Sequence, residues 1–185
     1  MKFSGSYELN SGKKKVWENL NNIDVLKKCI DGCEEFLCVD NNKYNAKIFI
    51  KLGPVNASFR STIEINNIIE EESYEIIAQG NAGQLGNASG KVIIFLKEID
   101  KTTILNYEAD TRINGRIAQL GSRLIDGSVK KNTDLFFQNF SKVLNEDSKV
   151  ILDDNKNNTT IKKVKVLTCL ILLFLIILFI GLYVR

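Results

Sequence analysis

The chain has 185 residues, enough for one domain of ordinary size with an appendage but too few for two domains with separate cores. Charged residues make up 25% of it and the net charge is only +3, so no strong single-sign field indicates nucleic acid as a partner. It contains no histidine, which removes the commonest general base at neutral pH, the commonest metal ligand and every nucleophile–histidine pair.

The N-terminal residues 1–8 lack the continuous apolar run of a secretory signal, so we expect the cysteines to lie in a reducing compartment. Cys29, Cys33 and Cys38 lie within ten residues, and a cluster this tight raises the alternative of a zinc or iron–sulfur site. No fourth cysteine or histidine completes a ligand set there, since Cys169 lies in a distant apolar segment. We therefore predict reduced, partly buried thiols and no metal.

About seven antiparallel strands are predicted from strict alternation of apolar and polar residues, with the apolar set always on one face. A turn at Gly53-Pro54 joins two of them into a hairpin. The predicted strands are 3–9, 36–39, 44–52, 55–65, 74–78, 90–96 and 105–113. Residues 13–20 and 25–29 are predicted as two short helices that close one end of the sheet, with Ser11 as the N-cap of the first.

A long helix is predicted at 116–144 to cover the apolar face of the sheet. At helical spacing one arc of it is apolar or small, comprising Ala118, Ser122, Ile125, Val129, Phe136, Phe140 and Val143. Its N-terminal half carries small residues, including Gly121 and Gly127, and a glycine inside a helix costs roughly 1 kcal/mol relative to alanine. Small residues here predict open space under the sheet; the alternative is close helix–sheet packing without a cavity.

The predicted cavity lies between the inner strand residues and the N-terminal half of the long helix. Ile117, Leu120 and Leu124 widen the apolar arc beside it, as a gate or a contact surface. The residues predicted to line the cavity and bind a ligand are Ile50, Phe59, Ile63, Ile76, Val92, Ile94, Tyr107, Ala118, Gly121, Ser122 and Ile125.

A single membrane-spanning helix is predicted at 166–184, because these nineteen residues carry no charge and as a helix would span about 28 Å. Lys162, Lys163 and Lys165 precede the segment and one Arg185 follows it, which predicts a cytoplasmic N-terminal side. The sequence thus divides into a domain at 1–145, a polar linker at 146–165 and a transmembrane tail anchor at 166–184. We expect a single-pass protein of the cell membrane.

Several motifs resemble those of the CoxG family of carbon monoxide dehydrogenase, a member of the START-like ligand-binding superfamily. The most specific is GRIAQLGSRLIDG at 115–127, followed by Lys130-Lys131 and Phe136-Phe137. Also similar, in the same order, are MKFSGSY at 1–7, VLKKCI at 25–30 with GCE at 32–34, KLGPV at 51–55, and the glycines at 83, 86 and 90. Asp31 departs from the family, which usually has proline there.

This resemblance implies an α+β helix-grip fold around an apolar cavity, with no catalytic residues. It implies a membrane accessory protein that binds a quinone or a lipid and recruits or matures a molybdenum hydroxylase of the carbon monoxide dehydrogenase type. Two alternatives stay open, a membrane adaptor with a closed core and an aromatase or cyclase of the same superfamily. The second would use the few inward polar residues, which are Tyr44, Ser61, Tyr74, Tyr107 and Thr111.

Overall fold

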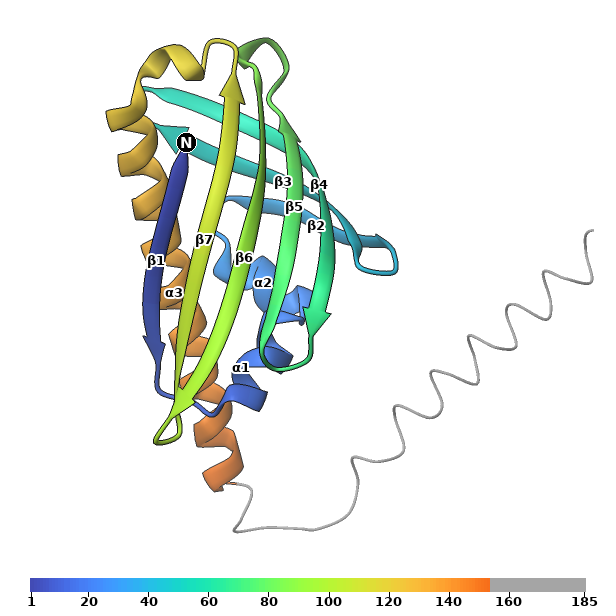
Figure 1. The fold of residues 1–185 in the computed structure, drawn as a ribbon, viewed down its shortest axis with the longest axis vertical. Helices are drawn as coiled ribbons and strands as arrows, with labels where there is room; N and C mark the ends of the chain where they lie inside the picture. Colours follow the sequence, from blue (N-terminus) through green and yellow to red (C-terminus); the bar gives the residue numbers. More distant parts are fainter. Residues whose placement is uncertain (154–185) are drawn as a thin grey trace, which may run out of the picture. The chain divides into compact units, whose positions relative to one another are not determined.

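Seven antiparallel strands form one sheet in the computed structural model, which describes the backbone of residues 1–153 and the side chains of residues 1–146 (Figure 1). The order across the sheet is β1-β7-β6-β5-β4-β3-β2, so β1 and β2 are its free edges. The strands are β1 (Lys2–Leu9), β2 (Cys33–Asp40), β3 (Lys43–Leu52), β4 (Val55–Ile69), β5 (Ser73–Asn81), β6 (Asn87–Ile99) and β7 (Thr102–Asn114).

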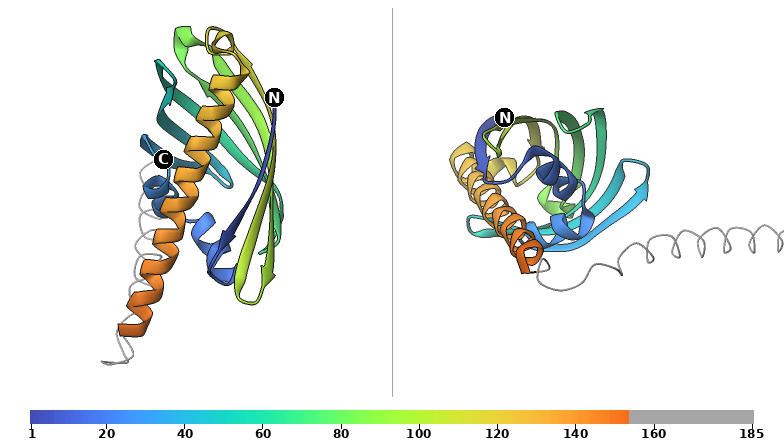
Figure 2. Two further views of the ribbon diagram at one scale, coloured as in Figure 1. Left: turned by 90° about the vertical axis from the view of Figure 1, so that its left-hand side faces the viewer. Right: turned by 90° about the horizontal axis from the view of Figure 1, so that it is seen from below.

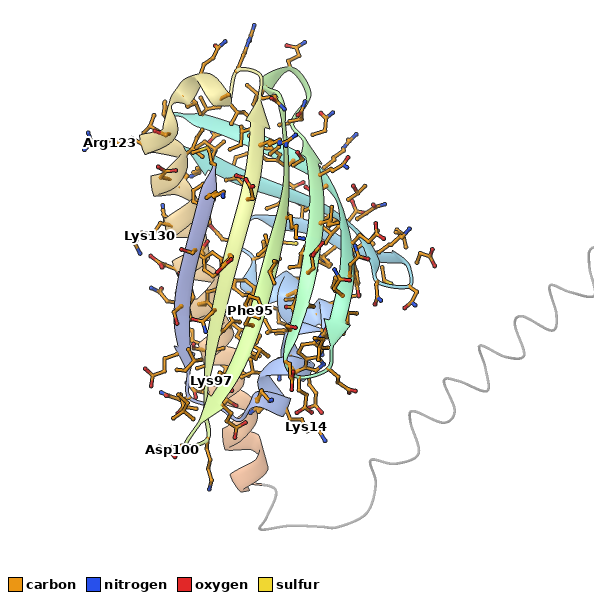
Figure 3. The ribbon with its side chains drawn as sticks, viewed as in Figure 1. Lys14, Phe95, Lys97, Asp100, Arg123 and Lys130 are labelled. Carbon is orange, nitrogen blue, oxygen red and sulfur yellow. The ribbon has the colours of Figure 1, made fainter. Side chains whose placement is uncertain are left out.

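Three α-helices and two short 3₁₀ turns complete the described chain. They are α1 (Lys13–Leu20), α2 (Ile23–Cys29), α3 (Ser122–Asp153), η1 (Gly83–Leu85) and η2 (Ala118–Leu120). The sheet curves around α3, which crosses its concave side (Figure 2). Charged side chains such as Lys97 and Arg123 project outward (Figure 3). The predicted α+β helix-grip arrangement of the described residues is therefore confirmed.

Two separate apolar clusters close the two ends of the interior. The larger joins α1, α2 and the C-terminal part of α3 to the sheet, and comprises Leu9, Val16, Leu20, Val25, Cys29, Leu96, Leu105, Phe137, Phe140 and Leu144. The smaller comprises Leu52, Ala57, Phe59 and Ile117. The predicted inner aromatic face of the long helix is confirmed, since Phe140 is fully buried. Between these clusters the inner face of the sheet is only half-buried.

The predicted start of the long helix is wrong. Residues after β7 first form the 3₁₀ turn η2, then Gly121 adopts a positive φ of 82°, and α3 begins only at Ser122. The break has a tertiary cause, because the amide of Ile117 donates to the carbonyl of Leu85 at 3.0 Å and this side chain is buried. At its other end α3 continues to Asp153, so the beginning of the predicted polar linker is helical.

The predicted cap of the first helix is also wrong. The N-cap of α1 is Gly12, without a side-chain hydrogen bond, whereas the amide of Ser11 donates to the carbonyl of Leu9. The better-capped helix is α2, where the Asn22 side chain accepts from the amides of Asp24 and Val25. Its acidic first turn and basic last turn both suit the helix dipole.

The described residues include no helix that is long and apolar enough to cross a membrane. The predicted spanning segment at 166–184, and the predicted linker beyond Asp153, lie outside the described residues. Contacts among Cα atoms group Met1–Asp147 as one compact unit.

Candidate functional site

The interior of the grip holds two adjoining chambers with volumes of about 480 and 550 Å³. The first lies toward the end of the sheet where β7 leads into α3, and the second lies toward α1 and α2. They meet at a shared set of residues, Ile48, Ile50, Ala78, Val92, Ile94, Thr133 and Phe137. Their walls are predominantly apolar, as in pockets that take a largely hydrophobic molecule.

Small residues in the middle of the sheet create this space. Ala78 pairs with Gly90 across β5 and β6, and Gly80 pairs with Ala88 in the neighbouring row. All four line the first chamber, together with Ala109 of β7. Larger side chains at these positions would reach toward α3 and fill the interior. The alternation that forms the strands therefore explains the inward direction of these residues, and their size explains the hollow.

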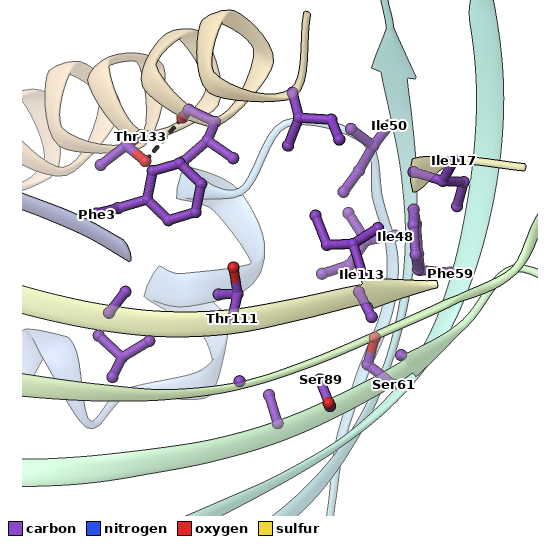
Figure 4. Close-up of a pocket in the computed structure, with 18 of the residues that line it drawn as sticks. Phe3, Ile48, Ile50, Phe59, Ser61, Ser89, Thr111, Ile113, Ile117 and Thr133 are labelled. Carbon is purple, nitrogen blue, oxygen red and sulfur yellow. Dashed lines mark hydrogen bonds between the residues drawn. The ribbon is translucent and has the colours of Figure 1, made fainter. Parts of the chain in front are cut away.

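The helix side of the first chamber is built by residues of α3 spaced four apart, namely Ile125, Val129, Thr133 and Phe137. This spacing places them on one face of the helix. Figure 4 shows Thr133 and Phe3 together at one end of the chamber and Ile113, Ile117 and Phe59 at the other.

Few polar groups face the first chamber. Thr133 donates its hydroxyl to the carbonyl of Val129 at 2.9 Å, so that group is already paired. The hydroxyl of Thr111 lies 3.3 Å from the carbonyl of Met1, and Figure 4 shows it directed from β7 into the space below α3. Ser61 stands opposite Gly80 on the inner face. The site therefore offers a molecule mainly apolar contact, with hydroxyl groups at its margins.

Most of the predicted lining residues lie in these walls. Phe59, Tyr107 and Ile125 line the first chamber, Ile63 and Ile76 line the second, and Ile50, Val92 and Ile94 line both. The inward polar residues divide in the same way, with Ser61, Tyr107 and Thr111 in the first chamber and Tyr44 and Tyr74 in the second. Burial raises the pKa of Tyr74 well above its ordinary value, so this phenol stays neutral.

Ala118, Gly121 and Ser122 are predicted to line the cavity, but they lie at the surface and outside both chambers. A side chain added at Gly121 would meet nothing within 4 Å. The reason is the break before α3, which turns these residues out of the helical arc that the prediction assumes. Among the predicted gate residues, Ile117 lines the chamber while Leu124 lies outside it.

Phe3, Val129, Thr133 and Phe137 line the first chamber but are absent from the predicted set. The helical members follow Ile125 at intervals of four, a signal that is present in the sequence. Phe3 comes from the edge strand β1, whose position beside α3 is a consequence of the sheet order.

A polar network ties β1 to α3 beside the first chamber. The hydroxyl of Tyr7 donates to Asp134 at 2.6 Å, Lys130 donates to the same carboxylate at 2.7 Å, and the Tyr7 ring stacks on Phe137. Burial and then the carboxylate of Asp134 raise the pKa of Tyr7, whereas the hydrogen bonds from Lys130 and Tyr7 lower the pKa of Asp134. The network therefore joins two segments that lie far apart in the sequence.

We expect Tyr7→Phe to lower the free energy of unfolding at neutral pH by about 1 kcal/mol, the usual net contribution of one hydrogen bond. The raised Tyr7 pKa contributes stability below the ordinary value of 10.0 that is lost as the pH rises through the folded-state pKa. The lowered Asp134 pKa contributes stability above 3.8 that is lost as the pH falls through the folded-state pKa. Tyr7→Phe should therefore flatten both limbs of the pH profile.

Urea unfolding at acid, neutral and alkaline pH measures this effect. Tyr44→Phe is the matched control, because this inward tyrosine packs beside Phe36 and its hydroxyl makes no hydrogen bond to another described residue. Equal losses in both variants, with unchanged pH profiles, would show that the network contributes nothing beyond ring packing.

The cysteines of the described residues are dispersed. Cys29 is buried and its carbonyl accepts from Asn139, whereas Cys33 and Cys38 lie on β2 with their thiols directed to backbone carbonyls of the same strand. Burial raises the pKa of both the Cys29 and the Cys33 thiol. Within residues 1–146 no group of three or more cysteine or carboxylate residues is arranged to hold a metal ion.

Known proteins share this architecture. A conserved protein from Geobacillus kaustophilus has 28% identity and a TM-score of 0.75, with 79% of this chain and 96% of that chain covered. The protein TTHA0849 from Thermus thermophilus has 9% identity and a TM-score of 0.60, covering 80% and 99% of the two chains. The ZhuI aromatase/cyclase from Streptomyces sp. R1128 has 11% identity and a TM-score of 0.55, covering 78% and 86%. The last two likenesses show the fold alone.

No curated protein matches the sequence. The family of the carbon monoxide dehydrogenase protein CoxG matches residues 5–145, which include most or all of every described strand and most of α3. The predicted resemblance is therefore confirmed, and the chain belongs to the CoxG family of carbon monoxide dehydrogenase.

Proposed function

We propose that this chain is a non-catalytic, membrane-anchored accessory protein that carries a hydrophobic molecule, a quinone or a lipid, in its two chambers. Its family membership supports an accessory role toward carbon monoxide dehydrogenase. In the fuller form of the proposal, the chain recruits or matures a molybdenum hydroxylase of that type at the cell membrane, with the domain on the cytoplasmic side.

The hollow apolar interior is the observation that carries the proposal. A domain needing only a stable core would gain by filling it, since each buried methylene contributes about 0.8 kcal/mol. Here small residues such as Ala78 and Gly90 leave half-buried isoleucines facing open space. Together the chambers form an elongated space, which suits a molecule with a ring at one end and an aliphatic chain at the other.

Mass spectrometry of organic extracts from the purified full-length chain tests this proposal. We expect a quinone or lipid in roughly stoichiometric amount, released only when the protein is denatured. Affinity purification from native membranes should also recover a molybdenum hydroxylase. A chain that yields no hydrophobic molecule under these conditions would instead be a closed-core adaptor.

An aromatase or cyclase activity is the second candidate, favoured only by the likeness of the fold to the Streptomyces enzyme. Such an enzyme needs groups that move protons at the substrate. The sequence supplies no histidine, and the inward polar side chains here are hydroxyl groups of serine, threonine and tyrosine. The binding role is therefore the simpler use of this interior.

Deleting 166–185 is expected to move the protein from the membrane fraction to the soluble fraction while the domain stays folded. The reason is that the apolar segment at 166–184 is long enough to cross a bilayer. Fractionation followed by circular dichroism of the soluble protein measures both effects. Persistent pelleting after a high-salt wash would contradict the tail as the main anchor, whereas release only by salt would indicate adsorption through surface cations.

A further inference from the structure

Three chain connections meet at the end of the domain that caps the first chamber. They are the β3–β4 turn, the β5–β6 connection containing η1, and the β7–α3 connection containing η2. The amide of Ile117 joins the last two by donating to the carbonyl of Leu85. A Cβ built at Gly53 would lie 3.4 Å from Leu124, which brings the first turn beside the start of α3.

This end carries cations without counter-charges. Lys51, Arg112, Arg116 and Arg123 are all exposed or partly exposed, and none of them forms an ion pair with another described residue. The segments 51–56, 81–88 and 112–124 contain no aspartate or glutamate. We call the exposed surface of these three segments the basic loop face.

Apolar side chains lie among these cations. Leu124 is 43% exposed, next to Arg123, and Leu85 and Leu120 are half-buried in the adjoining connections. The opposite end of the domain differs, because there Lys14 and Lys97 share the surface with Asp100 (Figure 3). Glu70, Glu71 and Glu72 lie on the β4–β5 connection. Charge is therefore unevenly distributed along the domain.

We propose that the basic loop face docks on the anionic surface of a phospholipid bilayer. Unpaired lysine and arginine side chains are attracted to acidic headgroups, and exposed leucines among them can enter the interfacial region. The occupant of this face is thus a lipid surface with negative charge. This docking would place the capped end of the first chamber against the source of a hydrophobic ligand, and in this respect it rests on the proposed function.

The length of chain before the apolar segment permits the contact. Residues 154–165 could span at most about 40 Å when extended, whereas the 32 residues of α3 measure about 48 Å. A domain tethered through the end of α3 therefore brings the basic loop face to the bilayer when it is inclined toward the surface.

Hydrogen–deuterium exchange of the full-length chain in lipid nanodiscs tests the proposal. One set of nanodiscs contains phosphatidylcholine alone and the other adds phosphatidylglycerol. Peptides covering 51–56, 81–88 and 112–124 are expected to exchange more slowly in the anionic nanodiscs, while peptides covering 70–72 and 97–102 exchange equally in both. The double variant Arg116→Gln, Arg123→Gln should lower the docked-to-undocked ratio about 30-fold and remove this difference.

The control variant Lys14→Gln, Lys97→Gln removes the same charge from the opposite end and should leave the protection intact. Equal exchange in the two kinds of nanodisc would overturn the proposal and leave these cations to an acidic soluble partner. Protection that is independent of lipid charge, or confined to the opposite end, would overturn it too. Extracts of the same preparations report the bound molecule separately, so an empty cavity with intact docking would contradict only the proposed function.

Discussion

Replacing Ala78 by leucine is expected to reduce the bound hydrophobic molecule by on the order of tenfold or more while leaving the domain at least as stable. Ala78 lies on β5 where the two chambers meet, and lines both of them. The added side chain would occupy space that a ligand needs and would bury apolar surface against Ile50 and Val92. Mass spectrometry of extracts and thermal unfolding, performed on the same preparation, measure the two effects.

The matched control is Ala57→Leu on β4. Ala57 is 1% exposed and packs in the cluster of Leu52 and Phe59, outside both chambers. The same enlargement there should overpack the core and lower the free energy of unfolding by about 1–3 kcal/mol. If Ala78→Leu is destabilised as strongly as the control and the wild-type protein yields no ligand, the carrier proposal fails and a ligand-free adaptor remains.

Gly86→Ala is expected to destabilise the domain by about 3 kcal/mol or more. Gly86 has a φ of 123°, which alanine adopts only with strain, and a Cβ there would overlap the carbonyl of Asn114. This close approach joins the β5–β6 connection to the end of β7, directly above the first chamber. The variant should therefore open the end of the domain that Ile117 closes.

Gly83→Ala separates backbone strain from this steric overlap. Gly83 also has a positive φ, of 61°, but a Cβ there would meet no atom within 4 Å. It should cost only about 1–2 kcal/mol, the ordinary penalty of a left-handed conformation. Urea unfolding of both variants measures the difference. Similar losses for the two would mean that the packing of Gly86 against Asn114 adds nothing to stability.

The division of the core into two clusters explains how one domain can be both stable and hollow. Phe140, Leu9 and Leu105 are almost fully buried at the end near α1 and α2. Leu52 and Ile117 close the other end. Because stability is concentrated at these ends, residues in between are free to be small, and substitutions that enlarge them act first on the cavity.

Most strands could be predicted from the chain alone because a period of two is a local property of the sequence. The alternation that includes Ile48 and Ile50, and that continues through Phe59 and Ile63, identified both the strands and their inner faces. The aromatic inner face of α3 at Phe136 and Phe140 followed from the helical period in the same way. These residues therefore also supplied most of the cavity wall.

The start of α3 could not be predicted from local pattern, because apolar spacing continues through 116–121. It depends on the burial of Ile117 and its hydrogen bond to Leu85, contacts between segments that become neighbours only when the sheet has formed. The pairing of Tyr7 with Asp134 is of the same kind, across 127 positions of sequence. Local periodicity thus specifies which face of each element is apolar, whereas helix boundaries and cavity walls depend on long-range contacts that close only in the folded chain.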